Sequence, residues 1–143
     1  MKKITLITGA AGLLGKMHSE AILETKKNLC ITDKDHKRLI KLYKYLKRKF
    51  PKSDILCDRL DVTKENQIKK LQKKLKKKYF VSVLINNAAI DFKIKSSSKS
   101  YSNSFYNFDL KRWNSEINVG LTGYFLMIKQ KVKVRLTMCF KKH

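Results

Sequence analysis

The sequence predicts an α/β fold of three layers, a parallel β-sheet between two layers of helices, and three observations lead to this prediction. Short apolar runs alternate with longer amphipathic segments along most of the 143 residues. The first apolar run ends in a glycine-containing turn, TGAAGLLG at residues 8–15, and a helix-like segment follows. Strands that alternate with helices of this length are typical of a parallel sheet covered on both faces.

The expected elements follow from the periodicity of apolar residues. Four apolar runs predict strands, at residues 3–8, 28–32, 55–57 and 81–86. Four amphipathic segments predict helices, at residues 12–26, 35–49, 64–80 and 109–130. A polar loop is expected to about Asn107. The order is therefore β-α-β-α-β-α-β-loop-α.

Individual residues support these boundaries. Leu13, Leu14 and Met17 give the first helix apolar side chains near helical spacing. The third helix carries a narrow stripe, with spacings of 3, 4 and 4, formed by Ile68, Leu71, Leu75 and Tyr79. Thr63 is a plausible N-cap for that helix, and Asp109 for the last one.

Composition limits the classes of function. The 34 basic and 11 acidic residues give a formal net charge of +23, which suggests nucleic acid or an anionic membrane as a partner. The basic residues are mostly lysines spread along the chain, whereas base-specific readout favours arginine. We therefore interpret them as a solvated, mutually repulsive surface, and nucleic acid is not the expected partner.

Cysteine usage and the N-terminus indicate the compartment. The three cysteines, Cys30, Cys57 and Cys139, are far apart and form no Cys/His cluster, so no metal site is expected. No apolar run approaches the roughly 18 residues of a membrane-spanning helix. The N-terminal run contains glycines and leads into a polar, helix-like segment rather than a cleavage site, which disfavours a signal peptide. A cytoplasmic protein is expected.

The glycines at 9, 12 and 15 stand directly after the first strand. Gly9 can make the tight turn, Gly12 can let backbone approach a pyrophosphate, and Gly15 can let the helix pack closely. The N-terminus of the helix then offers N–H groups to the phosphates. A glycine-rich turn in any α/β protein would give the same triplet.

Asp33 ends the second strand, 24 positions after Gly9. A carboxylate there can accept hydrogen bonds from the adenosine ribose, which favours NAD over NADP. Asp33 could instead cap the next helix. Lys34, Lys37 and Arg38 could hold a 2′-phosphate, so NADP stays possible.

Five landmarks occur together in one order. TGAAGLLG at 8–15, Asp33, LDVT at 60–63, NNAA at 86–89 and Asn118 within INVGLTGYFL resemble the short-chain dehydrogenase/reductase superfamily. The resemblance covers about residues 3–130 and implies a Rossmann-like fold that binds NAD(P). It departs from the commoner family pattern in two places, with GxxGxxG for GxxxGxG and NNAA for NNAG.

The resemblance implies roles at matching positions. Asp61 would reach the exocyclic amine of adenine beside Val62, Asn86 would brace the sheet, and Asn118 would help to place a water molecule for proton transfer. The implied cofactor-binding residues are Thr8, Gly9, Gly12, Leu13, Leu14, Gly15, Asp33, Asp61, Val62, Asn86, Asn87 and Ala88. The implied catalytic residue is Asn118. The segment FDLKRWNSEINVGLTGYF is similar to members that modify sugars, surface polysaccharides or flagellin.

The serine, tyrosine and lysine that carry the family's chemistry follow a fifth strand, and this sequence ends at His143, 25 positions after Asn118. The Tyr-x-x-x-Lys matches at 43–47 and 45–49 fall in the second helix and are expected by chance in so lysine-rich a chain. Residues 1–130 are therefore interpreted as an NAD(P)-binding region truncated after its fourth or fifth strand. Residues 131–143, KVKVRLTMCFKKH, are a divergent tail that alternates like a strand.

Three hypotheses follow. The first is a cofactor-binding fragment of an NAD(P)-dependent oxidoreductase that lacks Tyr-x-x-x-Lys. The second is a non-catalytic nucleotide-binding or regulatory module, and the third is a basic nucleic-acid-binding protein. A bare fourth strand and an apolar last helix also predict self-association, such as a dimer.

Overall fold

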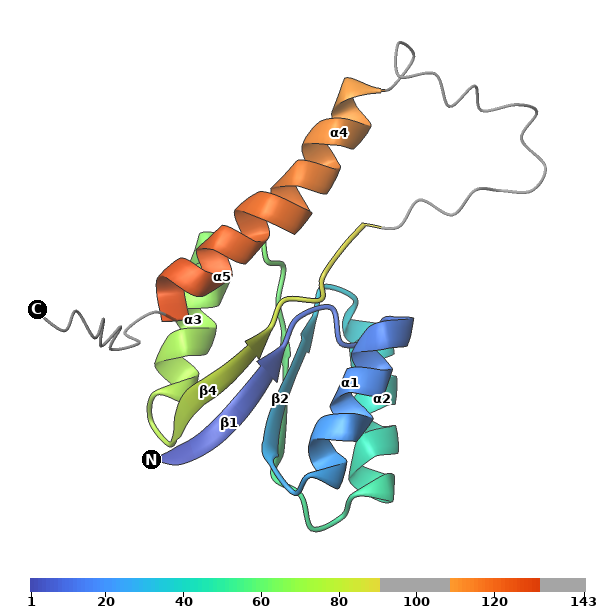
Figure 1. The fold of residues 1–143 in the computed structure, drawn as a ribbon, viewed down its shortest axis with the longest axis vertical. Coiled ribbons are helices and arrows are strands. Elements are labelled where there is room, and N and C mark those ends of the chain that lie inside the picture. Colours follow the sequence, from blue (N-terminus) through green and yellow to red (C-terminus); the bar gives the residue numbers. More distant parts are fainter. Residues whose placement is uncertain (91–108, 132–143) are drawn as a thin grey trace, which may run out of the picture.

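The computed structural model describes residues 1–90 and 109–131, in which strands and helices alternate (Figure 1). The elements are β1 (Lys2–Ile7), α1 (Leu13–Glu24), β2 (Asn28–Asp33), α2 (His36–Lys49), β3 (Ile55–Arg59), α3 (Glu65–Leu75), β4 (Tyr79–Ile85), α4 (Leu110–Ile117), the π-helical segment η2 (Asn118–Gly123) and α5 (Tyr124–Lys131). Most of the predicted polar loop and the tail after residue 131 lie outside the described residues.

The strands form one parallel sheet in the order β3-β2-β1-β4. Helices α1 and α2 lie on one face of the sheet, and α3 and α5 lie on the other (Figure 1). This arrangement confirms the predicted three-layer, Rossmann-like α/β fold. Because β1 pairs with β2 on one side and β4 on the other, the chain direction across the sheet reverses at β1, where such folds bind ligands.

Each face of the sheet has its own hydrophobic core. Toward α1 and α2, the core contains Ile7, Ala10, Leu23, Leu29, Ile31, Leu39, Leu42, Leu46 and Ile55. Toward α3 and α5, it contains Ile4, Leu6, Cys30, Leu60, Val62, Ile68, Leu71, Leu75, Tyr79 and Met127. The central strands β1 and β2 are thus buried on both faces, as is usual in a parallel sheet, whereas β4 is partly exposed.

Helix α1 buries a face different from the one that its large apolar residues suggest. Leu13, Leu14 and Met17 are 80%, 60% and 62% exposed. The buried residues are Gly15, Ser19 and Leu23. The hydroxyl of Ser19 donates to the Gly15 carbonyl at 2.7 Å, so this buried polar group is satisfied within the helix. Small residues therefore set α1 close to the rest of the domain, and its first apolar residues remain at the surface.

The predicted helix at 64–80 was too long. Helix α3 ends at Leu75, and Tyr79 begins β4 instead of continuing the helical stripe. Thr63 is not the N-cap, since Lys64 occupies that position. The prediction for Asp109 is confirmed, because its carboxylate accepts the Lys111 N–H at 3.0 Å at the start of α4.

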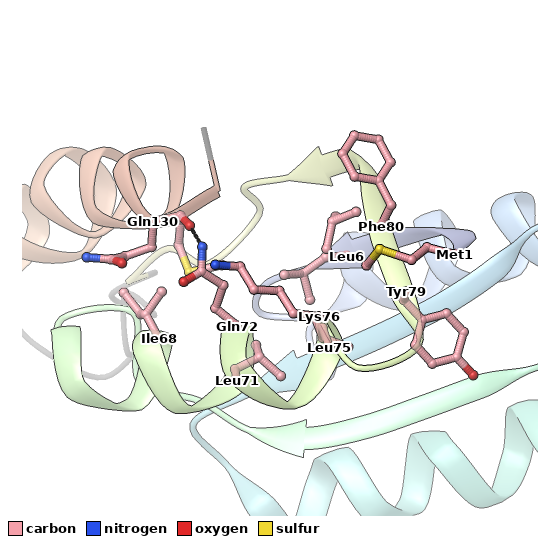
Figure 2. A pocket seen from close by; sticks show the side chains of 12 residues that line it. Met1, Leu6, Ile68, Leu71, Gln72, Leu75, Lys76, Tyr79, Phe80 and Gln130 are labelled. Carbon is pink, nitrogen blue, oxygen red and sulfur yellow. Dashed lines mark hydrogen bonds between the residues drawn. The ribbon is translucent and has the colours of Figure 1, made fainter. Parts of the chain in front are cut away.

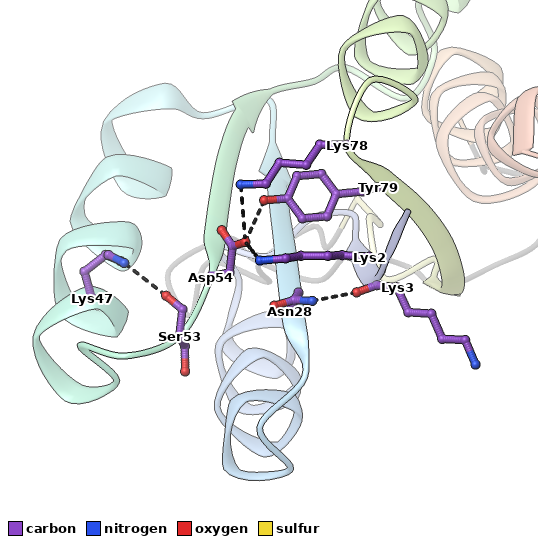
Figure 3. Close-up of polar contacts among 8 residues, drawn as sticks. All are labelled: Lys2, Lys3, Asn28, Lys47, Ser53, Asp54, Lys78 and Tyr79. Atoms are coloured by element: carbon purple, nitrogen blue, oxygen red, sulfur yellow. Dashed lines mark hydrogen bonds and ion pairs between the residues drawn. The ribbon is translucent and has the colours of Figure 1, made fainter.

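A polar cluster around Asp54 joins the amino ends of the strands (Figure 3). The hydroxyl of Tyr79 donates to Asp54 Oδ2 at 2.7 Å. The ammonium groups of Lys2 and Lys78 lie 3.9 Å and 3.8 Å from the same oxygen. Burial, together with the hydrogen bond to Asp54, raises the pKa of Tyr79. The cluster fastens β4 to the segment that leads into β3, across the width of the sheet.

Among the described residues, no helix is both long enough and apolar enough to cross a membrane.

Candidate cofactor-binding cleft

The turn after β1 requires glycine at two of its three glycine positions. Gly9 has φ of +62°, and a Cβ there would lie 2.7 Å from the Cα of Ala88. A Cβ on Gly15 would lie 2.6 Å from the Cα of Ala10 and would also meet the Gly9 carbonyl. Real Cβ contacts are not this short, so the packing of α1 against the turn depends on glycine.

Gly12 differs, because the surrounding protein does not require a glycine there. It is the N-cap of α1 with φ of −76°, and an added Cβ would meet only the Gly9 carbonyl oxygen, at 3.4 Å. Among the described residues, no side chain makes a capping hydrogen bond at this end of the helix. A glycine that packing does not demand, at an uncapped helix N-terminus, fits a close approach by an anionic group such as a phosphate.

Asp33 and Arg38 hold the glycine turn from the side of β2 and α2. Asp33 Oδ2 accepts the Ala11 N–H at 3.0 Å, and its Oδ1 accepts the Asp35 N–H at 2.9 Å. The guanidinium of Arg38 donates to the Ala11 carbonyl at 2.9 Å. The N-cap of α2 is Asp35, so the alternative role considered for Asp33, as the cap of that helix, is wrong.

The segment after β4 is fastened to the end of β1. The hydroxyl oxygen of Thr8 accepts the N–H groups of Asn87 and Ala88, both at 3.1 Å. The side-chain amide of Asn87 donates to the Gly9 carbonyl at 2.9 Å. Asn86 behaves differently, since its Oδ1 is buried and has no hydrogen-bond partner among the described residues.

Asp61 is fixed by Thr63, two positions further along the chain. Its Oδ1 accepts both the N–H of Thr63 at 3.0 Å and the hydroxyl of Thr63 at 2.7 Å. Partial burial opposes ionisation of Asp61, but these hydrogen bonds and the nearby charges of Lys64 and Lys34 outweigh it and lower its pKa. The carboxylate is therefore ionised at neutral pH and oriented at the carboxyl edge of the sheet.

These segments border one cleft of about 550 Å³ at the carboxyl edge of the sheet. The predicted residues that line it are Gly9, Gly12, Leu13, Leu14, Asp33, Asp61, Val62, Asn87 and Ala88. The predicted residues that do not line it are Thr8, Gly15, Asn86 and Asn118. Thr8 and Gly15 support the turn without lining the cleft. Thr8 binds the N–H groups of Asn87 and Ala88, and Gly15 packs against Ala10.

Several residues that line the cleft were not among the predicted cofactor-binding residues. They are Lys34, Asp35, Arg38, Leu60, Thr63, Ala89, Ile90 and Val119. Most stand next to a predicted residue in the sequence, as Leu60 and Thr63 flank Asp61 and Val62. Leu60, Thr63, Ala89 and Val119 already lie within the quoted motifs, and Lys34, Asp35 and Ile90 follow a quoted residue or motif by one or two positions. Lys34 and Arg38 were considered in the sequence as residues that could hold a 2′-phosphate, and both line the cleft.

Asn118 begins the π-helical segment between α4 and α5. Val119, the next residue, lines the cleft, whereas Asn118 itself does not. Gly123 ends the segment, and a Cβ there would lie 2.7 Å from Cγ2 of Val62. The helix that carries Asn118 therefore packs directly against a wall of the cleft.

The two Tyr-x-x-x-Lys matches lie in α2, away from this cleft. Lys47 donates to the Ser53 carbonyl at 3.1 Å, and Lys49 pairs with Glu20. Neither lysine nor its tyrosine, Tyr43 or Tyr45, lines the cleft. Within the described ranges, no group of three or more His, Cys, Asp or Glu residues is arranged to hold a metal ion.

A glycine turn after the first parallel strand, an acidic residue at the end of the second and a cleft at the switch point define a dinucleotide-binding α/β protein. Comparisons with known proteins place it more narrowly. A family model described as short chain dehydrogenase matches residues 3–137. The chain belongs to this family of oxidoreductases, whose members bind NAD(P).

Curated and solved relatives are consistent with the family. The chain is 30% identical over 133 residues to the 3-oxoacyl-(acyl-carrier-protein) reductase FabG of Buchnera aphidicola, covering 92% of this chain and 49% of that protein. The solved levodione reductase superposes with a TM-score of 0.79 at 20% identity, over 92% of this chain and 48% of that one. An alcohol dehydrogenase from Thermococcus sibiricus, solved with 5-hydroxy-NADP, gives 0.76 at 22% identity, over 92% and 52%. The chain thus spans about half the length of these proteins.

Proposed function

We propose that this chain is the cofactor-binding half of a short-chain oxidoreductase and that it binds NAD in the cleft at the carboxyl edge of the sheet. The observation that supports this most directly is the joining of the glycine turn to Asp33 through the Ala11 N–H. It brings the turn proposed to hold phosphate and the carboxylate proposed to hold ribose to one cleft. A bound nicotinamide would supply the hydride acceptor or donor of the reaction.

The residues of the cleft fit the parts of a dinucleotide in order. Gly12 and the uncapped N-terminus of α1 would hold the pyrophosphate, and Asp33 would accept hydrogen bonds from the adenosine ribose. Asp61 and Val62 would border the adenine. Leu14, exposed at the start of α1, would offer apolar surface beside the nicotinamide end.

NAD rather than NADP is favoured by the position of Asp33, whose charge would repel a 2′-phosphate. Arg38 is adjacent but is hydrogen-bonded to the Ala11 carbonyl. Replacing Asp33 by serine removes the repulsion while leaving Arg38 in place. We expect this variant to gain affinity for NADPH relative to NADH, and an unchanged preference would contradict the role given to Asp33.

The proposal is tested by titrating the full chain with NADH and following the fluorescence of the reduced nicotinamide. The test variant is Gly12→Ala, because its Cβ disturbs little protein but enters the space assigned to phosphate. The control is Gly120→Ala, because a Cβ there meets nothing within 4 Å. We expect saturable binding that Gly12→Ala weakens at least about tenfold, equal to 1.4 kcal/mol, and that Gly120→Ala leaves unchanged. Equal binding by both variants would overturn the assignment.

For this chain alone we propose cofactor binding without turnover. The Tyr-x-x-x-Lys matches lie in α2, outside the cleft, so no described residue of that pattern can act as the acid and base. The substrate class, with sugars as the first candidates, would be selected by residues beyond those described. Oxidation of an added polyol by the purified chain in the presence of NAD would contradict binding without turnover.

A further inference from the structure

Each face of the sheet carries a cavity that lies outside the cleft. One cavity, of about 440 Å³, is mainly apolar and lies between α3, β4 and α5, where the leucines of α3 point into it (Figure 2). The other, of about 600 Å³, lies beside β1, β4 and the turn between α1 and β2. Four of its nine lining residues are lysines, so the two cavities suit different ligands.

The second cavity, here called the lysine hollow, lies at the amino ends of the strands. Its lysines are Lys2, Lys3, Lys26 and Lys27. Thr5 also lines it, on the face of β1 opposite to Ile4 and Leu6, which belong to the core toward α3 and α5. The side-chain amide of Asn28 donates to the Lys3 carbonyl at 2.8 Å and holds the turn beside β1 (Figure 3). The cofactor cleft lies at the opposite edge, and the six residues of β1 between them span about 20 Å, so the two sites are separate.

The described protein does not neutralise the charge of the hollow. No described Asp or Glu residue lines it. Lys2 lies 3.9 Å from Asp54, whereas the other three lysines are exposed and have no ion pair with a described carboxylate. Figure 3 shows the side chain of Lys3 extending away from the cluster around Asp54. Because like charges gathered in this way repel each other, a bound anion would relieve the repulsion.

The backbone at Lys26 departs from the usual chemistry of a helix end. Lys26 follows Thr25, the C-cap of α1, and has φ of +58°. Glycine is the usual residue in this left-handed conformation, because a larger residue is strained there. A lysine thus occupies a position that glycine would adopt more easily, and its side chain lines the hollow. Such strain indicates a role for the side chain other than folding.

Strand β4 has a bulge at the same hollow. The consecutive β1 residues Ile4 and Thr5 pair with Val81 and Val83. Ser82 is therefore an extra residue in β4, and a bulge of this kind redirects the side chains around it. Ser82 is exposed and lines the hollow, where its hydroxyl can donate a hydrogen bond to an anion.

We propose that the lysine hollow binds a compact oligophosphate, an anion such as tripolyphosphate. Lysine ammonium groups bind phosphate oxygens as point charges and need no fixed planar geometry. No described aromatic residue lines the hollow, so it offers nothing on which the bases of a nucleic acid strand would stack. A concave site with four lysines fits a short anion that carries several charges in a small volume.

The test is calorimetric titration of the full chain with sodium tripolyphosphate at constant ionic strength. The test variants are Lys3→Gln and Lys26→Gly. The matched control is Lys70→Gln, which removes the same charge from an exposed position on α3, on the opposite face of the sheet (Figure 1). We expect saturable binding that each test variant weakens at least about fivefold, equal to about 1 kcal/mol, and that the control changes by less than about twofold. Lys26→Gly should keep or raise the urea midpoint, because glycine adopts a positive φ without strain.

Four results would overturn the proposal. One is the lack of saturable binding, and another is equal weakening by Lys3→Gln and Lys70→Gln, which would show attraction to net charge alone. Weakening by Gly12→Ala with none by Lys3→Gln would place the anion in the cofactor cleft. Tighter binding of a single-stranded DNA oligonucleotide matched in phosphate number would identify nucleic acid as the ligand. Lys3, Lys26 and Lys70 are all exposed, so we expect the variants to fold and the comparison to be decisive.

Discussion

The glycine at position 15 offers the sharpest test of how the cleft is built. Replacing Gly15 by alanine places a Cβ 2.6 Å from the Cα of Ala10 and 2.7 Å from its carbonyl oxygen. Favourable carbon–carbon separation is about 3.5 Å or more, so roughly 0.9 Å must be found by moving backbone. Ala10 is fully buried, and its N–H donates to the Thr32 carbonyl at 3.0 Å, so it cannot move freely.

The expected cost follows from these contacts. Overpacking costs about 1–3 kcal/mol, and the upper part of that range applies because the obstacle is hydrogen-bonded backbone. Alanine recovers about 0.5–1 kcal/mol of helix propensity. We therefore expect Gly15→Ala to lower the free energy of unfolding by about 2 kcal/mol. Gly120→Ala, with open space around its Cβ, should raise it by up to about 1 kcal/mol.

Urea denaturation of the full chain, followed by circular dichroism, measures both variants against the unmodified protein. Gly12→Ala belongs in the same series and should lie within about 0.5 kcal/mol of the unmodified chain, because its Cβ meets only an ordinary contact. Equal urea midpoints for Gly15→Ala and Gly120→Ala would show that the close packing of α1 on the turn contributes nothing to stability.

Three further predictions concern other parts of the molecule. Tyr79→Phe removes the hydrogen bond to Asp54 and should lower the free energy of unfolding by about 1 kcal/mol, measured by urea denaturation. The pKa of Asp61 is lowered in the folded state, so its stabilising contribution is present above its unfolded pKa and is lost as pH falls through the folded value. An Asp61→Asn chain should therefore lose less stability than the unmodified chain on acidification below about pH 4. Leu121 is 65% exposed on the apolar side of the last helix, and Leu121→Glu should reduce any concentration-dependent association seen by sedimentation velocity.

The parallel sheet could be predicted from the sequence because its strands are continuous apolar runs, as strands buried on both faces usually are. The exception at β4 is instructive. Tyr79 continues the spacing of Ile68, Leu71 and Leu75, so periodicity alone assigns it to the helix. In the structure it begins a strand, and its hydroxyl donates to Asp54, which precedes β3 on the far side of the sheet. The hydrogen bond between Tyr79 and Asp54 joins residues 25 positions apart, so the local periodicity of the sequence does not reveal it.

The buried face of α1 could not be read from the sequence, for a different reason. Large apolar side chains usually mark the buried face of a helix, but here Gly15 and Ser19 mark it. The turn brings the helix so close to the backbone of Ala10 that only small residues fit on that face. Leu13 and Leu14 are consequently placed at the cleft, where a ligand rather than the core can cover them. The same close approach thus explains both the exposure of these leucines and their position at the cleft.

The π-helical segment η2 joins α4 to α5 and packs against the wall of the cleft. A regular helix from Leu110 to Lys131 would have its residues in unbroken register, whereas the wider turns of η2 insert extra backbone at Asn118–Gly123. Gly123 lies where that backbone meets Val62, and no larger residue fits there without displacing this wall of the cleft. The segment that begins at Asn118 is therefore packed, through Gly123, against Val62 in the wall of the cleft. The helix therefore helps to shape the cleft through Val119 and Gly123, although no described Tyr-x-x-x-Lys match lines it.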